Sequence, residues 1–165
     1  MDKVCAIIDA QGFHANGRFF PREIAIITKN FKMCVEMDTK LDYINLSSSD
    51  CRTNMFIEKH LLGMTLRSDS TLNCDNIITK IYQLIADNDK YLFGVKNYQL
   101  ERILKRLEIP YINLQCPTVV SLDAQYGYWQ CDNHTAIPRG RCALRKCMHI
   151  LEWMTSQDTP IFEIL

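Results

Sequence analysis

The chain has 165 residues, of which 47% are hydrophobic and 23% charged, and these values fit a single globular domain. No apolar run is long enough to span a bilayer, and the first ten residues contain acids that signal peptides lack. We therefore expect an intracellular protein without membrane contact, whose eight cysteines are reduced or bind metal. The formal net charge is zero, yet residues 91–150 carry eight lysines and arginines against four acids, which indicates either a polyanion-binding face or solvated helix surfaces.

Three strands are predicted at the start of the chain. Residues 4–9 form a short apolar run, and the Asn-Gly pair at 16–17 is a strong hairpin signal before a returning strand over 19–28. Pro21 indicates an edge or a bulge near the start of that strand. Residues 31–37 alternate between apolar and other side chains, as a half-buried strand does. The chain is therefore expected to open with a three-stranded antiparallel meander.

Helices and strands alternate along the rest of the chain. The predicted helices cover 51–63, a segment after a cap at Asn73 or Asp75, 98–108 and 142–154, and the predicted strands cover 91–95 and 111–114. This order predicts an α/β fold of ribonuclease H-like type. The meander is followed by αβαβα, and a mixed sheet with a central first strand carries helices on its faces. Residues 1–156 would form this domain and 157–165 a flexible C-terminal tail.

A nuclease centre of the two-metal type needs several carboxylates around its cations. Asp9, at the end of the first predicted strand, is a weak candidate catalytic residue. The neutral Gln11 follows two positions on, and Lys96 and Asn97 stand after the strand at 91–95, where a further acid would be needed. One early carboxylate cannot make the usual cluster. The alternative interpretation of Asp9 is a turn residue at the end of a strand.

Cys131, His134 and Cys142 stand at C-x2-H-x7-C spacing. Thiolate and imidazole ligands suit zinc, which prefers tetrahedral sulfur and nitrogen donors. Cys142 falls near the start of the last predicted helix, where the helix dipole and unpaired N–H groups favour a thiolate. Three ligands at a non-standard spacing leave two interpretations open: a zinc site, or two buried thiols beside a surface histidine.

Two segments resemble the Maelstrom domain, a ribonuclease H-like domain of a piRNA-pathway protein. They are FFPREIAIITKN (19–30) and CDNHTAIPRGRCAL (131–144). That family carries a Glu-Cys-His-Cys set in place of the nuclease acids, and the matching positions here are Glu23, Cys131, His134 and Cys142. Residues 38–128 match only in pattern.

The resemblance implies that these four residues bind zinc. Four protein ligands close the coordination shell, so such a zinc is structural and would tie the second strand to the last helix. The resemblance also implies single-stranded RNA binding, an RNA cleavage that does not use the usual acids, and a cytoplasmic or nuclear location of germ-granule type.

The basic residues in the second half of the chain are the candidate RNA contacts, because phosphate contacts give affinity without sequence choice. They are Arg139, Arg141, Arg145, Lys146, Lys96, Arg102, Lys105 and Arg106. Three aromatic residues before Cys131 could stack on bases or pack in the core: Tyr126, Tyr128 and Trp129.

The leading hypothesis is a zinc-stabilised ribonuclease H-like domain that binds single-stranded RNA, with at most weak cleavage, in small-RNA, transposon or virus-related processes. The alternative is a catalytically inactive nuclease fold that binds a protein partner, to which the apolar tail 160–165 would add a strand. A third candidate is a 3′–5′ exonuclease that depends on Asp9.

Overall fold

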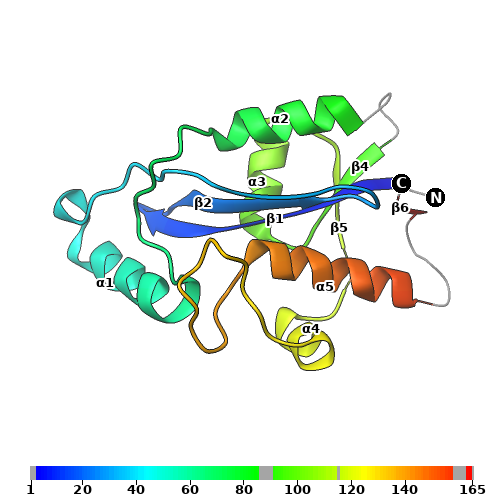
Figure 1. Cartoon of the computed structure of the whole chain (residues 1–165). Helices are drawn as coiled ribbons and strands as arrows, with labels where there is room; N and C mark the ends of the chain where they lie inside the picture. Colours follow the sequence, from blue (N-terminus) through cyan, green and yellow to red (C-terminus); the bar gives the residue numbers. More distant parts are fainter. Residues whose placement is uncertain (1–2, 86–90, 115, 158–162, 165) are drawn as a thin grey trace.

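The computed structural model of the chain describes residues 3–85, 91–114, 116–157 and 163–164. Its centre is a mixed sheet with strand order β3-β2-β1-β4-β5 (Figure 1). The strands are β1 (Lys3–Ala15), β2 (Arg18–Ile27), β3 (Lys32–Glu36), β4 (Tyr91–Val95) and β5 (Tyr111–Asn113). β1, β2 and β3 pair antiparallel, whereas β4 joins β1 and β5 joins β4 in parallel. The α/β class, the meander and the central first strand are confirmed.

β1 is longer than the apolar run at residues 4–9 indicated. The strand continues to Ala15, and Asp9 lies in its middle, paired with Ala25 of β2. The interpretation of Asp9 as a turn residue at a strand end is therefore wrong. The polar residues after Asp9 remain extended because β2 continues to pair with them.

The turn between β1 and β2 is the one that the Asn-Gly pair predicted. Asn16 and Gly17 have φ angles of 51° and 71°, which match the left-handed backbone of a two-residue hairpin turn. Ala15 pairs directly with Arg18 across it. The turn therefore fixes the register of the first residue pairs.

A bulge interrupts this register close to Pro21, as predicted. Gly12 pairs with Pro21, but the neighbouring Gln11 pairs with Glu23, so Arg22 is an extra residue in β2. Arg22 leaves the ladder, and its guanidinium Nε donates a hydrogen bond to the carbonyl of Thr65 (2.9 Å). The extra residue therefore also connects β2 to the segment that follows η2 (Ile57–Leu62).

The helices of the described residues are α1 (Ser48–Phe56), α2 (Cys74–Ile85), α3 (Tyr98–Arg106), α4 (Val119–Tyr126) and α5 (Ala143–Ser156). A short 3-10 turn, η1 (Tyr43–Asn45), precedes α1, and α1 runs on into the π-helical η2, which ends at Gly63. Asn73 caps α2 by accepting a hydrogen bond from the Asn76 N–H (3.1 Å). All the predicted helices are present. α4 was not predicted, because its eight residues bury Leu122 and Asp123 without an apolar stripe at helical spacing.

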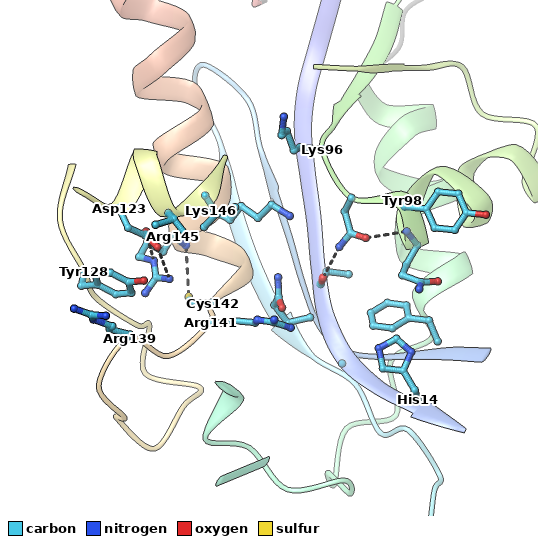
Figure 2. Close-up of a pocket in the computed structure, with 18 residues that line it drawn as sticks. His14, Lys96, Tyr98, Asp123, Tyr128, Arg139, Arg141, Cys142, Arg145 and Lys146 are labelled. Atoms are coloured by element: carbon cyan, nitrogen blue, oxygen red, sulfur yellow. Dashed lines mark hydrogen bonds and ion pairs between the residues drawn. The ribbon is translucent and has the colours of Figure 1, made fainter. Parts of the chain in front are cut away.

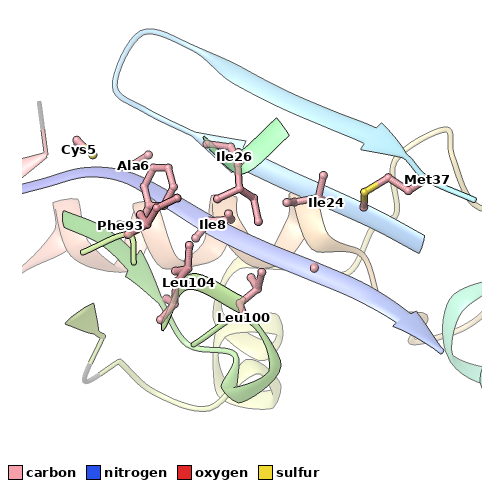
Figure 3. Packing of buried hydrophobic residues seen from close by; sticks show 13 residues of the cluster. Cys5, Ala6, Ile8, Ile24, Ile26, Met37, Phe93, Leu100 and Leu104 are labelled. Carbon is pink, nitrogen blue, oxygen red and sulfur yellow. The ribbon is translucent and has the colours of Figure 1, made fainter. Parts of the chain in front are cut away.

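The helices cover the two faces of the sheet, and β2 shows how the faces divide. Ile24 and Ile26 pack with Phe93 and with Leu100 and Leu104 of α3 (Figure 3). The alternate residues Ala25 and Ile27 belong to the opposite core, which includes Cys147 and Ile150 of α5. α2 and α3 therefore lie on one face and α4 and α5 on the other (Figure 1).

Much of the predicted tail, 157–165, lies outside the described residues. Within it, β6 (Glu163–Ile164) pairs in parallel with the first residues of β1. No helix in the described ranges is long and apolar enough to span a bilayer.

Candidate metal centre and adjoining basic cleft

The four residues of the Glu-Cys-His-Cys set meet at one point of the structure. Glu23 comes from β2, Cys131 and His134 come from the loop between α4 and α5, and Cys142 is the N-cap of α5. Their potential ligand atoms all lie within 4.8 Å of one another, and Glu23 and Cys142 are buried. The sequence left open a zinc site or two buried thiols beside a surface histidine. The second interpretation is excluded, because the His134 side chain is 0% exposed. The four residues could hold a metal ion.

The loop between α4 and α5 is shaped to present two of these ligands. The His134 N–H donates to the Cys131 carbonyl (3.2 Å), which closes a tight turn between them. The Thr135 N–H donates to the carbonyl of Gly63 (2.7 Å). Gly63 has a φ of 66°, and a side chain there would collide with the Thr135 backbone. The loop is therefore fixed against the end of η2 at a position that requires glycine.

His134 is oriented as metal-binding histidines are. Its Nδ1 lies 2.6 Å from the Leu62 carbonyl oxygen, so an N–H at Nδ1 donates there and Nε2 faces the centre. Nε2 lies 2.7 Å from Glu23 Oε2 but makes no hydrogen bond within the described part of the chain. Burial lowers the pKa of His134, but Cys142 and the Glu23 carboxylate raise it to about 10 overall. A metal ion would displace this proton.

Backbone N–H groups of Cys131 and of the first turn of α5 favour negative charge at the centre. Glu23 Oε1 accepts the N–H of Ala143 (2.7 Å), and Cys142 Sγ accepts the N–H groups of Cys131 (3.4 Å) and Arg145 (3.5 Å). The predicted place of Cys142 at the start of the last helix is confirmed. Two thiolates, a carboxylate and a neutral imidazole would leave one excess negative charge around a dication, and these N–H groups offset it.

Cys34 is a further thiol at this centre that sequence reasoning missed. Its Sγ lies 3.9 Å from Cys131 Sγ, and the Asn133 side-chain amide contacts it at 3.6 Å. Cys34 pairs with Ala25, two residues after Glu23 on the same face of β2. The predicted alternation of β3 and its pairing with β2 were the signals that could have placed it there.

Asp9 is buried behind residues that line a cleft, and Lys146 balances its charge. Asp9 Oδ1 lies 3.0 Å from the ammonium of Lys146 on α5 and accepts a hydrogen bond from the Asn97 side chain (3.2 Å). Asp9 Oδ2 accepts a hydrogen bond from the Gln11 side chain (2.8 Å). A lysine and two amides therefore surround this carboxylate, where a two-metal nuclease has further acids.

The cleft has a volume of about 480 Å³ and is lined by β1, the start of α3, α4 and the start of α5 (Figure 2). Five of the eight predicted basic residues line it: Lys96, Arg139, Arg141, Arg145 and Lys146. Figure 2 shows them entering from different segments of the chain. The topology thus gathers cations that the sequence distributes over fifty residues.

The basic side chains of the cleft differ in whether contacts within the protein already occupy them. Arg145 is buried and donates to the carbonyls of Trp129 (2.8 Å) and Gly140 (2.7 Å), and its Nε lies 3.1 Å from Asp123. Its role in the structure is to hold the loop. Arg139 and Arg141 are exposed and form no ion pair within the described residues. These two side chains can reach a ligand.

The three basic residues of α3 lie elsewhere. Arg102 and Arg106 line a neighbouring depression, together with Arg18. Arg106 is held by both oxygens of Asp75 (2.7 and 2.9 Å), and Lys105 is exposed.

Exposed aromatic side chains stand on opposite walls of the cleft. Tyr128 is 46% exposed and stacks on the Arg145 guanidinium at 4.5 Å from its ring centroid. Tyr98, which sequence reasoning did not single out, is 68% exposed across the cleft (Figure 2). Trp129 is exposed too, whereas Tyr126 is half-buried against His149.

The chain was compared with protein-family models, with curated proteins and with solved structures. None of the three comparisons found a match, so the function of this chain is inferred from the geometry of the centre and the cleft.

Proposed function

We propose that this chain is a zinc-stabilised domain of ribonuclease H-like fold, related to the Maelstrom domain, that binds single-stranded RNA in the basic cleft. The observation that carries the proposal is the pairing of the cleft residue Lys146 with the buried Asp9. A nuclease position that would hold cations through carboxylates instead carries a fixed ammonium, and the cleft keeps Arg139 and Arg141 exposed above it.

The donor set supports zinc as the ion. Two sulfurs, one imidazole nitrogen and one carboxylate oxygen are a set that zinc accepts in tetrahedral geometry. The His134 Nδ1 hydrogen bond to a carbonyl is the outer contact that zinc-binding histidines usually make. With four protein ligands the ion would have no open position for substrate, so its role would be structural.

The lining of the cleft supports a single-stranded ligand. Lys96, Arg139 and Arg141 offer charge to phosphates, and Tyr98 and Tyr128 offer ring faces for unpaired bases. Base stacking needs bases that are splayed out, which a duplex does not provide.

The same geometry argues against the Asp9-dependent exonuclease. A carboxylate already bound by Lys146, Asn97 and Gln11 has little capacity left for a divalent cation. Any RNA cleavage by this chain is therefore expected to persist in Asp9→Asn.

The test measures binding to labelled single- and double-stranded RNA and DNA, with and without EDTA, at several salt concentrations. The triple variant Lys96→Ala, Arg139→Ala, Arg141→Ala should weaken binding to single-stranded RNA and lower the slope of log K against log salt by about two, since each single-strand phosphate contact contributes about 0.7. The matched control, Lys32→Ala, Arg52→Ala, Lys80→Ala, removes three exposed cations away from the cleft and should bind normally.

Equal binding by the two triple variants would exclude the cleft as the RNA site. No binding of the wild-type protein to any nucleic acid would leave the catalytically inactive protein-interaction module as the better interpretation.

A further inference from the structure

Two thiols touch at the edge of the metal centre, and only one of them belongs to the ligand set. Cys131 Sγ and Cys34 Sγ lie 3.9 Å apart, although the residues are 97 positions apart in sequence. Both cysteines are half-buried, so small solutes can reach them from one side. A zinc centre does not require this contact, because four other donors already complete the set.

The two thiols differ in the backbone that carries them. Cys34 is held by the pairing of β3 with β2, where it lies opposite Ala25. Cys131 lies in the loop between α4 and α5, whose backbone is not part of the sheet. A disulfide needs the sulfurs about 2.05 Å apart, so the remaining approach of the two sulfurs has to come mainly from rotation of the two side chains.

We propose that Cys34 and Cys131 are a peroxide-oxidation site, at which Cys34 resolves an oxidised Cys131 into a disulfide and so removes Cys131 from the metal centre. The oxidant is a hydroperoxide, with hydrogen peroxide as the simplest case. The disulfide itself does not depend on RNA binding.

The disulfide forms in two steps, through a sulfenic acid on Cys131. The Cys131 thiol releases its proton to solvent, its sulfur attacks one oxygen of hydrogen peroxide, and the O–O bond breaks. The hydroxide that leaves takes a proton from solvent to become water, and Cys131 becomes a sulfenic acid. The Cys34 sulfur then attacks the Cys131 sulfur, and the departing hydroxide takes the Cys34 proton as water. Two thiols lose two electrons, and one peroxide becomes two water molecules.

Cys142 is a weaker partner for Cys131 than Cys34 is. It is buried, at 1% exposure, and its sulfur accepts the backbone N–H of Arg145 in the first turn of α5 as well as the N–H of Cys131 itself. Movement of Cys142 Sγ toward Cys131 would leave the Arg145 N–H without its partner. The Cys34 sulfur packs against the core under α5 but accepts no backbone N–H in the described residues, and its polar contacts there are with Cys131 and the Asn133 amide.

If the proposed function is correct, oxidation of Cys131 also affects RNA binding in the cleft. Cys131 cannot be a metal ligand and a disulfide partner together, so oxidation would release the ion. The loop that starts at Cys131 also carries Arg139 and Arg141 into the cleft. Oxidation would therefore weaken RNA binding through the loop, and dithiothreitol would restore it.

The experiment titrates the purified, reduced protein with hydrogen peroxide and maps the first disulfide by mass spectrometry of unreduced tryptic peptides. Trypsin cuts after Lys32, Arg139 and Arg141, so it places Cys34, Cys131 and Cys142 in different peptides. We expect the loss of two thiols per chain, a Cys34–Cys131 link, and full recovery of both thiols with dithiothreitol.

The variant Cys34→Ser should lose the link, and its Cys131 should proceed to sulfinic acid, which dithiothreitol does not reverse. The control Cys51→Ser, at a half-buried cysteine that contacts the carbonyls of Tyr43 and Leu46, should behave like the wild type. A first disulfide between Cys131 and Cys142, or reversible oxidation of Cys131 in Cys34→Ser, would overturn the proposal. Neither result depends on whether RNA binds.

Discussion

At the scale of single residues, the most informative side chain is Lys146. It is an ordinary basic residue on the surface side of a predicted helix, yet it lies 3.0 Å from a carboxylate that is 1% exposed. A buried charge is tolerated when a partner and hydrogen bonds compensate for its lost hydration. Lys146 provides the opposite charge for Asp9, and Asn97 and Gln11 complete the hydrogen bonds.

The variant Lys146→Met should therefore lose about 3 kcal/mol of unfolding free energy, because it leaves Asp9 buried without its opposite charge. Urea unfolding followed by circular dichroism measures this. The double variant Asp9→Asn, Lys146→Met should recover most of the loss, since it removes the charge together with its partner. A single variant as stable as the wild type would show that water already hydrates Asp9.

The site could be predicted from sequence in part. The spacing of Cys131, His134 and Cys142 indicated a shared centre, and Glu23 joined them through the resemblance. The predicted meander could have placed Cys34 on the face of Glu23, but its contact with Cys131 depends on the register between β2 and β3, which the sequence does not determine. The environment of Asp9 was equally hidden, since it is assembled from side chains of β1, the end of β4 and α5.

At the scale of elements, one carboxylate ties the end of β3 to the segment after η2. Asp38 Oδ1 accepts hydrogen bonds from Arg67 Nε (2.8 Å) and from the Ser68 N–H (3.2 Å). Asp38 Oδ2 accepts a second bond from the Arg67 guanidinium (2.9 Å). The hydrogen bonds from Arg67 lower the pKa of Asp38 from 3.8 to about 2.

This pKa shift predicts a pH dependence of stability. A carboxylate with a lowered pKa in the folded protein stabilises it above the ordinary pKa, and the contribution disappears as pH falls from about 4 to about 2. The variant Asp38→Asn should be less stable than the wild type at pH 6, by about 1 kcal/mol or less for this partly exposed pair, and the difference should vanish toward pH 2. Chemical unfolding at each pH measures the difference.

Asp69→Asn, at an exposed acid in the neighbouring segment, is the matched control and should show no such trend. A stability difference for Asp38→Asn that stays constant between pH 6 and pH 2 would contradict the role of ionised Asp38.

The elements themselves were largely predictable, with two exceptions that share one cause. The long helices and the meander carry strong periodic patterns, and the structure has them where expected. α4 lacks such a pattern, and the second half of β1 is polar where a buried strand is usually apolar. Both elements are stabilised by partners that local sequence does not reveal. Arg145 and His149 of α5 bind Asp123 of α4, and β2 pairs with the second half of β1.

At the scale of the whole molecule, the four-residue centre joins parts of the chain that are far apart in sequence. Glu23 accepts the N–H of Ala143, which lies 120 positions further along the chain. The loop between α4 and α5 is in turn fixed to the end of η2. A metal ion at this centre would therefore connect the meander, the α1–η2 region and α5. Its removal is expected to affect global unfolding rather than one loop.

Zinc analysis should accordingly find about one ion per chain, and treatment with a strong chelator should lower the thermal midpoint. An ion present at a thousand times its dissociation constant adds about 4 kcal/mol to the folded state. The variant Cys131→Ser should start from a low midpoint and should not respond to added zinc. Identical midpoints with and without the chelator in wild-type protein that contained zinc would contradict a structural role.

The bulge at Arg22 decides which face of the sheet each later residue of β2 occupies relative to β1. Side chains alternate between the faces of a strand with a period of two, so one added residue exchanges the faces for everything beyond it. Without Arg22 as an extra residue, the turn at 16–17 would place Glu23 opposite Ala10, which belongs to the core under α3. With it, Glu23 lies opposite Gln11, on the face of Asp9 and α5. The single extra residue within β2 therefore decides on which face of the sheet the metal centre lies, in addition to the ligands themselves.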